Sequence, residues 1–307
     1  MDGPRVLVCD PIHDDGVKIL REAGYIVDLR TSITGIELVG AVEEFDAIVV
    51  RSRTQVTEQV LEAGKRLKAV ARAGVGLDNV DLNAAKQSGI IVVNSPEAPS
   101  NAVAELVLGL MLSLARRIPE ADDSMKKGEW IKKRLTGIEL KGKTLGIIGF
   151  GRIGYRLAKI AVALEMRVLT YDVVIEKLME FVEESGADAV DLDELLGASD
   201  FVTIHVPLLP QTKHMIGTEE ISAMKDGAYL INAGRGGLID EEALRKALVN
   251  GKLAGAGLDV YEEEPPRGIS LIGLQHVVSL PHIGSATVEA QRANSTVVAE
   301  KLVKILG

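Results

Sequence analysis

The second half of the sequence places three kinds of chemically useful side chain directly after short apolar runs. Arg235 stands among glycines in LINAGRGGLID, His282 follows an apolar run in SLPHIGSAT, and three consecutive glutamates, 262–264, precede Pro265. A guanidinium group binds a carboxylate and a neighbouring carbonyl oxygen, and an imidazole exchanges a proton near neutral pH. A carboxylate can orient that imidazole and stabilise its charged form. An enzyme that transfers a hydride to or from a cofactor needs these groups to orient and protonate its substrate.

Each of these residues also has a structural interpretation. Arg235 could lie in an ordinary turn, a single histidine is more often structural than catalytic, and the glutamate run could be a solvated loop. The residues alone do not choose among Glu262, Glu263 and Glu264. No C-x-x-C, H-E-x-x-H or paired His/carboxylate spacing supports a metal site, and no G-x-S-x-G turn supports a serine nucleophile. We therefore predict no metal.

The stretch 145–172 must position the cofactor for such chemistry. It is typical of a strand, a glycine turn, an amphipathic helix and a second strand that ends on Asp172. Gly149, Gly151 and Gly154 have the G-x-G-x-x-G spacing that brings the backbone close to a pyrophosphate at a helix N-terminus. A bare fingerprint could be only a tight turn, but here the strand, the helix and the acid all stand at the expected places. A carboxylate at Asp172 would accept hydrogen bonds from a ribose and repel a 2′-phosphate, which predicts NAD rather than NADP.

Length and composition limit the class of protein. A chain of 307 residues is long enough for two domains with sizeable cores. Its net charge of −9 argues against a general nucleic-acid or membrane-surface binder, and one cysteine, Cys9, excludes an internal disulfide framework. The sequence shows neither a secretion signal nor an apolar stretch of about 18 residues. We therefore expect a cytoplasmic protein.

Strand-like and helix-like segments alternate in both halves of the chain. The expected strands lie at 5–10, 25–29, 46–52, 68–74, 90–94, 144–149, 166–172, 201–207, 228–234, 254–260 and 276–281. This alternation predicts an α/β fold with two doubly wound parallel sheets, five strands in the first and six in the second. Ligands of such sheets bind at the carboxyl ends of the strands. Three first-half strands end on residues suited to an anion, namely Arg51 with Ser52, Arg72 with Gly74, and Asn94 with Ser95.

Between the two series lies a helical segment, 102–118, that is apolar on nearly every face. Such a helix is too apolar for the surface of a monomer, so we expect it between domains, between subunits, or both. A charged stretch follows, with Trp130 and the basic cluster 132–134. This cluster is a solvated face or a part that reaches a neighbouring subunit.

These residues resemble a known family, the NAD-dependent D-2-hydroxyacid dehydrogenases, over nearly the whole chain. The resemblance lies in the fingerprint LGIIGFGRIG with Asp172, and in HVPLLPQT, NAGRGGLIDEEAL, AGLDVYEEEPP and LPHIGSAT. It implies that Arg235, Glu264 and His282 are catalytic, so the choice of Glu264 comes from the family. It also implies a Rossmann NAD-binding domain, 99–284, inserted in a flavodoxin-like substrate domain, 1–98 plus 285–307, onto which the last helix crosses back.

The expected ligand contacts follow from the residues and the resemblance together. Those expected to bind the cofactor are Gly149, Gly151, Arg152, Ile153, Gly154, Asp172, His205, Val206, Pro207, Thr212, Ala233, Gly234, Asp259 and Gly284. Those expected to bind the substrate are Arg51, Ser52, Arg72, Gly74 and Arg134. His13, His214 and His276 are expected to be structural or surface residues.

Within the family the chain is most similar to the branch that oxidises 3-phosphoglycerate in the first step of serine biosynthesis. The similarity lies in VRSRTQVT, ARAGVGLDNVDL and the segment 125–146. It implies a homodimer formed through the helix 102–118 and the basic segment after it. Many members carry a further C-terminal regulatory domain, whereas this sequence stops at Gly307, so we expect no feedback control by serine through such a domain. Two alternatives stay open: a glyoxylate or hydroxypyruvate reductase, and an NAD-sensing scaffold similar to certain corepressors.

Overall fold

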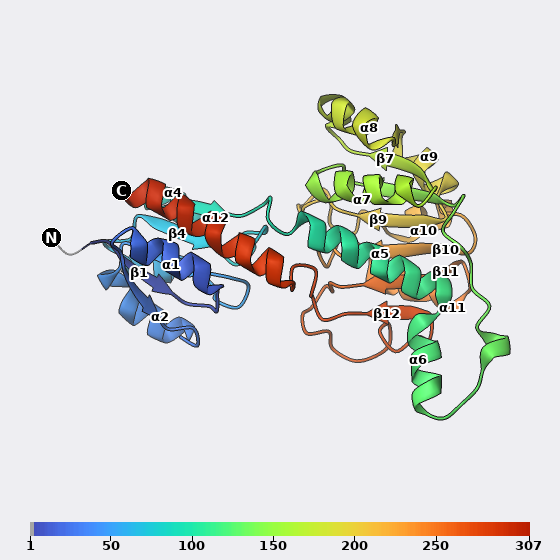
Figure 1. Ribbon diagram of the computed structural model, residues 1–307, viewed down its shortest axis with the longest axis horizontal. Coiled ribbons are helices and arrows are strands. Elements are labelled where there is room, and N and C mark those ends of the chain that lie inside the picture. Colours follow the sequence, from blue (N-terminus) through green and yellow to red (C-terminus); the bar gives the residue numbers. More distant parts are fainter. Residues whose placement is uncertain (1–2) are drawn as a thin grey trace. The chain divides into compact units, whose positions relative to one another are not determined.

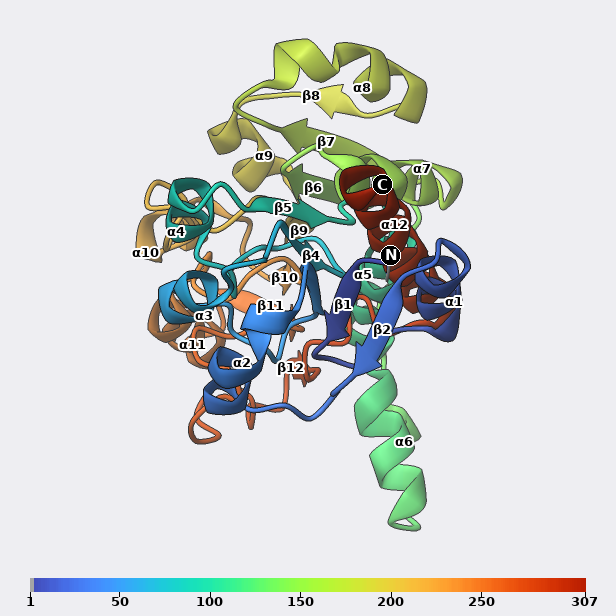
Figure 2. The same ribbon diagram turned by 90° about the vertical axis from the view of Figure 1, so that its left-hand side faces the viewer.

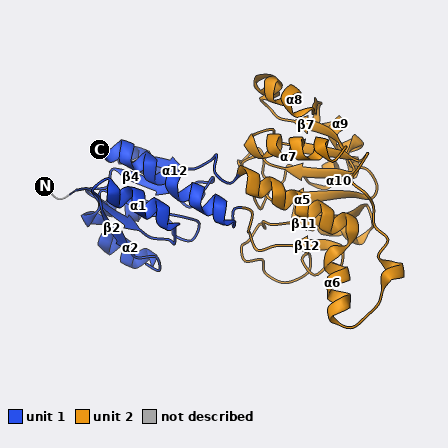
Figure 3. Ribbon diagram, in the orientation of Figure 1, with its two compact units in different colours: residues 1–99, 285–307 blue, residues 100–284 orange. Residues whose placement is uncertain are grey.

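The computed structural model describes residues 3–307, and the chain forms two compact units (Figure 3). Unit 1 comprises residues 1–99 and 285–307, and unit 2 comprises residues 100–284. The boundary between them lies one residue beyond position 98, where we drew it from the sequence.

Unit 1 is built on a five-stranded parallel sheet with the order β2-β1-β3-β4-β5. Its elements are β1 (Arg5–Val8), α1 (Asp14–Glu22), β2 (Ile26–Leu29), α2 (Gly35–Ala41), η1 (Val42–Glu44), β3 (Ala47–Val50), α3 (Glu58–Ala63), β4 (Ala69–Arg72), α4 (Leu82–Gln87), β5 (Ile91–Asn94) and α12 (Val288–Leu306). Successive side chains of a strand point to opposite faces, and both faces are covered. Leu7 and Ile48 pack in one cluster with residues of α2, α3 and α4, and Val6 and Val49 pack in another with α1 and α12.

The last helix completes unit 1. The side chains of Val298, Ala299 and Leu302 on α12 are buried in the same cluster as β1 and β3, and α12 lies alongside α1 (Figures 1 and 2). Thr287 caps this helix by accepting a hydrogen bond from the N–H of Ala290. The segment furthest along the chain therefore belongs to the unit in which the chain begins.

Unit 2 is built on a seven-stranded parallel sheet with the order β12-β11-β10-β9-β6-β7-β8. Its elements are α5 (Ser100–Arg116), α6 (Ile118–Lys126), η2 (Lys132–Arg134), β6 (Thr144–Ile148), α7 (Arg152–Ala163), β7 (Arg167–Tyr171), η3 (Ile175–Leu178), α8 (Met179–Ser185), β8 (Asp188–Ala189), α9 (Leu192–Ala198), β9 (Phe201–Ile204), α10 (Thr218–Ala223), β10 (Ala228–Asn232), α11 (Glu241–Val249), β11 (Leu253–Leu258) and β12 (Val277–Ser279). Both sheets are parallel with helices on both faces, which confirms the predicted fold class. The second sheet has one strand more than predicted. The additional strand is β8, which the sequence did not indicate because it is only two residues long and has no apolar run.

Helix α5 packs on the sheet of unit 2 itself. Val107, Leu110 and Leu114 are buried in one cluster with the strands of this sheet. A Cβ atom on Gly257 would lie 3.1 Å from the Cβ atom of Leu110, and one on Gly255 would lie 3.1 Å from a methyl group of Leu114. The absence of a side chain at Gly255 and at Gly257 of β11 therefore lets α5 approach closely. Its own sheet thus buries one face of α5, whereas Leu112 is 38% exposed. Burial of the remaining face between domains or subunits stays a prediction.

The segment 118–136, which we call the arm, projects from unit 2. It contains α6 and η2, and α6 points away from the sheet in both views (Figures 1 and 2). Two bonds close its base: Nη1 of Arg117 donates to the carbonyl oxygen of Arg134, and the N–H of Ile138 donates to that of Ala115. The indole of Trp130 remains 77% exposed. The arm is thus fixed at its base and exposed along its length.

Candidate active site

The glycine turn joins β6 to α7 in unit 2. Gly149 has a φ of +94°, and a Cβ atom there would lie 2.8 Å from the carbonyl carbon and oxygen of His205. A Cβ atom on Gly154 would lie 2.5 Å from the carbonyl oxygen of Gly149. By contrast, a Cβ atom on Gly151 would meet nothing within 4 Å. Two glycines therefore permit close packing, while the third leaves open space in front of the turn.

This open space suits a phosphate group. Gly151 is the N-cap of α7, and no side chain caps this helix, so backbone N–H groups of its first turn face outward without a side-chain acceptor. Such a helix N-terminus favours a negatively charged ligand. Arg152 is exposed and Ile153 half-buried at the start of the same helix. The turn therefore fits the pyrophosphate of a dinucleotide.

Asp172 follows β7 and faces the same turn. Its Oδ2 atom accepts a hydrogen bond from the N–H of Phe150 at 2.9 Å, and its Oδ1 atom accepts one from the N–H of Val174 at 3.0 Å. Each carboxylate oxygen has two acceptor sites, so both oxygens can still accept a ribose hydroxyl. The hydrogen bond from Phe150 fixes the carboxylate beside the glycine turn.

His205 follows β9 on the other side of the turn. Its Nε2 atom lies 3.1 Å from the hydroxyl oxygen of Thr203, whereas its Nδ1 atom is shielded from solvent and has no hydrogen-bond partner. Burial of the imidazole lowers the pKa of His205 to about 4, so the ring is neutral at pH 7. Val206 packs against Gly149, and the hydroxyl of Thr212 donates to the carbonyl oxygen of Pro207 at 2.7 Å. This strand end thus presents an uncharged wall.

Arg235 lies in a tight turn after β10. The buried side chain of Asn232 holds this turn, because its Nδ2 atom donates to the carbonyl oxygen of Arg235 and its Oδ1 atom accepts from the N–H of Gly234. A Cβ atom on Gly236 would lie 1.7 Å from the carbonyl oxygen of Tyr261. The turn with Arg235 therefore fits against the loop that follows β11. Asn232 was not among the predicted residues, although a polar residue at the end of an apolar strand is a usable signal.

The structure separates the three consecutive glutamates. Glu262 contacts Nε2 of His214 at 3.1 Å, and Glu263 pairs with Arg267. The Oε2 atom of Glu264 lies 2.7 Å from Nδ1 of His282, and its Oε1 atom accepts a hydrogen bond from the N–H of Tyr261 at 3.2 Å. Among the residues that the structure describes, Glu264 is thus the glutamate of this run that pairs with the histidine.

Asp259 fixes the loop that presents the histidine. Its carboxylate is fully buried, and its two oxygens accept hydrogen bonds from the N–H groups of Ile283 and Gly284, each at 2.8 Å. Burial raises the pKa of this carboxyl group, while the two backbone hydrogen bonds oppose the rise. His282 itself has a φ of 53°, in the left-handed region that few side chains adopt. Contact of Asp259 and Gly284 with the cofactor stays a prediction, as does that of Ala233, which is buried at the end of β10.

In unit 1 the predicted substrate residues meet at one edge of the sheet. Val50 pairs in register with Arg72, and Arg72 pairs with Asn94, so Arg51 with Ser52 lies beside them at the carboxyl ends. Gly74 has a φ of +153°, and a Cβ atom there would lie 1.7 Å from Nη1 of Arg72. The arginine side chain thus lies across this glycine.

Two other predicted residues of these loops have structural contacts. The hydroxyl of Ser95 donates to Oδ1 of Asn294 on α12 at 2.6 Å, and Nδ2 of Asn94 donates to the carbonyl oxygen of Val75. Arg134, the last predicted substrate residue, lies in unit 2 on the exposed arm. The structure therefore brings Arg51 and Arg72 together but places Arg134 on a separate element.

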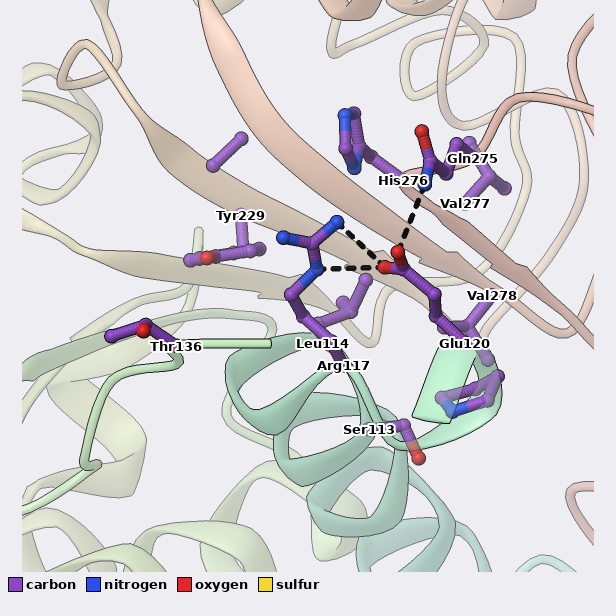
Figure 4. A pocket seen from close by; sticks show the side chains of 12 residues that line it. Ser113, Leu114, Arg117, Glu120, Thr136, Tyr229, Gln275, His276, Val277 and Val278 are labelled. Atoms are coloured by element: carbon purple, nitrogen blue, oxygen red, sulfur yellow. Dashed lines mark hydrogen bonds and ion pairs between the residues drawn. The ribbon is translucent and has the colours of Figure 1, made fainter. Parts of the chain in front are cut away.

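Two cavities of about 230 Å³ lie within unit 2, and neither includes a predicted site residue. One, at the junction of α5 and α6, is lined by Leu114, Tyr229 and Val277 among others (Figure 4). Arg117 and Glu120 point toward one another in it, 2.6 Å apart, and Gln275 donates to the same carboxylate. Its charged groups thus satisfy one another.

Residues 3–307 include no helix that is long and apolar enough to cross a membrane. The same range contains no group of three or more His, Cys, Asp or Glu residues that could hold a metal ion.

A glycine turn, an acid beside it at the end of the next strand and a histidine–glutamate pair on one doubly wound sheet are typical of NAD-dependent dehydrogenases. Residues 108–284 match the family described as "D-isomer specific 2-hydroxyacid dehydrogenase, NAD binding domain". This match covers more than half of the chain, and the chain belongs to this family. The predicted family and its cofactor, NAD, are thereby confirmed.

Individual relatives agree with this assignment. The chain is 51% identical over 98% of its length to a D-3-phosphoglycerate dehydrogenase of Methanocaldococcus jannaschii, and this match covers 57% of that relative. It is 46% identical to a hydroxypyruvate reductase of Thermotoga maritima, with 99% of this chain and 98% of the relative covered. Among solved structures, the holo form of Rhodotorula graminis D-mandelate dehydrogenase superimposes with a TM-score of 0.90 at 30% identity, covering 98% of this chain and 94% of that one. The chain thus spans little more than half of the phosphoglycerate dehydrogenase it matches, but nearly all of the reductase.

Proposed function

We propose that the protein is an NAD-dependent dehydrogenase that oxidises 3-phosphoglycerate at C2 and, in reverse, reduces 3-phosphohydroxypyruvate. The pairing of His282 with Glu264 in the unit that holds the dinucleotide turn is the observation that carries this proposal. The relative with 51% identity bears the name of this activity, and the arginines at the edge of the unit 1 sheet suit a phosphorylated acid.

The proposed roles follow from the contacts of each residue. NAD, when bound, supplies the acceptor for the hydride from C2. Because Nδ1 of His282 is held by Glu264, Nε2 is the atom that takes the proton of the C2 hydroxyl group. Glu264 stabilises the resulting imidazolium, and the guanidinium of Arg235 holds the substrate carboxylate and the forming carbonyl oxygen. In reduction, protonated His282 returns the proton.

The substrate's phosphate needs positive charge outside this group of residues. Arg51 and Arg72 lie at the carboxyl ends of neighbouring strands, where parallel sheets bind ligands. We assign the phosphate and the far end of the substrate to these arginines together with Ser52 and Gly74. Arg134 on the arm of a second subunit completes this set in the proposed homodimer.

The decisive experiment follows NADH absorbance with phosphohydroxypyruvate, hydroxypyruvate and glyoxylate side by side. We expect the highest kcat/KM with phosphohydroxypyruvate. Preference for an unphosphorylated acid would overturn the proposed substrate, and lack of NADH oxidation with all three acids would favour the scaffold alternative.

A hydroxypyruvate reductase is the second candidate, and one observation favours it. The relative that this chain matches over nearly its whole length bears that name. The two candidates differ in their need for a phosphate site. Replacement of Arg51 by Gln should raise the KM for a phosphorylated acid much more than the KM for hydroxypyruvate if the first proposal holds.

We further propose a homodimer in which the arm contacts a second subunit. The arm exposes Trp130 together with Ile118 and Met125, which are 49% and 57% exposed. Large apolar side chains that project from a protein and are interleaved with basic ones commonly mark an interface between proteins. One face of α5 packs on its own sheet and is not available to a second subunit. We therefore propose that the arm contributes more to the dimer interface than α5 does.

A further inference from the structure

We propose that Asp10, a residue without a sequence motif, is the positioning residue of the phosphate site, because it fixes the turn that carries Arg51. This inference rests on the proposed function. Asp10 follows β1, which is the neighbour of β3 in the sheet, so its side chain lies beside the turn at the end of β3. Only 1% of the residue is exposed.

The carboxylate of Asp10 holds the turn 51–54 through both oxygens. Its Oδ2 atom accepts hydrogen bonds from the N–H of Arg51 at 2.5 Å and from the N–H of Thr54 at 3.3 Å. Its Oδ1 atom accepts one from the hydroxyl of Thr54 at 2.8 Å. The buried side chain of Asn79 holds the same turn from the other side, by donating to the carbonyl oxygens of Arg51 and Thr54. The backbone of Arg51 is therefore fixed by buried polar groups.

The two arginines of this turn have different environments. Nη2 of Arg53 lies 2.9 Å from Oδ1 of Asp10, and the same guanidinium donates to the carbonyl oxygens of Cys9, Thr31 and Ile33. Arg53 is thus the counter-ion that allows a carboxylate to be buried here. The Arg51 guanidinium donates instead to a neutral group, the carbonyl oxygen of Pro11, at 3.2 Å.

This division leaves a positive charge available for a ligand. Arg53 and three hydrogen bonds satisfy Asp10, and within residues 3–307 the guanidinium of Arg51 has no carboxylate partner. A buried carboxylate beside an arginine would normally form an ion pair with it. Here Asp10 pairs with Arg53 instead, so the guanidinium of Arg51 is not neutralised by Asp10. Asp10 therefore orders Arg51 through its backbone without neutralising it, which is the arrangement that an anionic substrate requires.

The test compares Asp10→Asn with Asp46→Asn. Asp46 is a matched control, because it is also a buried carboxylate of this sheet, accepts from the N–H of Arg5 and pairs with Arg66 and Lys68, but lies before β3 at the opposite edge. We expect Asp10→Asn to raise the KM for phosphohydroxypyruvate about tenfold or more, since a misplaced arginine loses a charge-assisted hydrogen bond. The kcat and the KM for NADH should change less than about twofold, and Asp46→Asn should leave all three constants unchanged.

A second pair of variants covers the case in which Asp10→Asn does not fold. Thr54→Val removes the hydroxyl that donates a hydrogen bond to Asp10, and we expect the same selective rise in the KM for phosphohydroxypyruvate. Thr54→Ser keeps the hydroxyl and should behave as the wild type. An unchanged KM in Thr54→Val, or the same rise in Asp46→Asn, would overturn the inference.

A double variant distinguishes this inference from the proposed function. If Asp10 acts through Arg51, then adding Asp10→Asn to Arg51→Gln should raise the KM by less than about twofold further. Full additivity of the two changes would overturn the inference while leaving the function intact. If the wild type does not reduce phosphohydroxypyruvate, or if Arg51→Gln leaves its KM unchanged, then the proposed phosphate site fails, and the inference fails with it.

Discussion

The Nδ1 atom of His282 lies 2.7 Å from the Oε2 atom of Glu264. Hydrogen bonds from backbone N–H groups fix both the glutamate and the loop that carries the histidine. Glu264 accepts a hydrogen bond from the N–H of Tyr261, and the loop of His282 donates two to buried Asp259. The ring orientation is thereby set before a substrate arrives. Such pre-organisation is what proton transfer at a defined atom requires.

Substitutions in this pair should lower turnover without releasing the cofactor. We expect His282→Gln to lower kcat by about 10³-fold, within the range typical for loss of a general acid–base, because glutamine cannot take up a proton. Glu264→Gln should lower it less, since the imidazole remains. NADH fluorescence titration should give an unchanged Kd in both variants.

The neighbouring glutamates provide the controls. Glu262→Gln and Glu263→Gln change the same charge in the same run, but their carboxylates contact His214 and Arg267 instead. Both variants should keep kcat within about threefold of the wild type, the size expected for an exposed ion pair. A loss in either that equals the loss in Glu264→Gln would contradict the assignment.

The glycines of the dinucleotide turn should respond differently to alanine. Gly149→Ala puts a side chain at a φ of +94° and 2.8 Å from the backbone of His205, so we expect a loss of stability of about 1–3 kcal/mol or more. Gly151→Ala meets open space and should keep the thermal midpoint. It should instead raise the Kd for NADH about tenfold, because the added methyl group occupies space that the pyrophosphate of the cofactor needs. Equal midpoints for the two variants would refute this division.

Much of this site could be predicted from sequence, because its signals are local. The glycine spacing, the apolar runs before Arg235 and His282, and Asp172 at a strand end all lie within short windows. The pairing of Glu264 rather than Glu262 with His282 depends on the loop's path, so the residues alone could not give it, and the family resemblance supplied it. Asp10 was missed because a lone polar residue after a strand has no distinguishing pattern. Asn232 was missed although a polar residue at the end of an apolar strand is a usable signal, and β8 was missed because its two residues have no periodicity.

The arm offers a test of the proposed dimer. Trp130→Glu places a charge on a side chain that is 77% exposed in the single chain, so the fold of unit 2 should tolerate it. At an interface the same change leaves a charge in a desolvated contact, which costs several kcal/mol. We therefore expect sedimentation velocity to show a dimer for the wild type and a monomer for the variant, with the same circular dichroism spectrum. Val249→Glu is the control, because this residue is 60% exposed at the end of α11 and is not part of the arm. Dimers in both variants would place the contact elsewhere.

The neutral imidazole of His205 should make stability depend on pH. Burial lowers its pKa to about 4 from an ordinary value of 6.5, so the unfolded chain takes up a proton near pH 6.5 that the folded chain does not. The free energy of unfolding should therefore be unaffected above about pH 6.5 and fall between about pH 6.5 and about pH 4. The loss attributable to this group is about 3 kcal/mol. Urea unfolding of the wild type and His205→Gln from about pH 7.5 to about pH 4.5 isolates it, because all other groups titrate in both. Parallel slopes for His205→Gln and the wild type would show that the imidazole is charged or solvated in the folded protein. Because His205 stays neutral near pH 7, a change in kcat near that pH must come from the titration of another group.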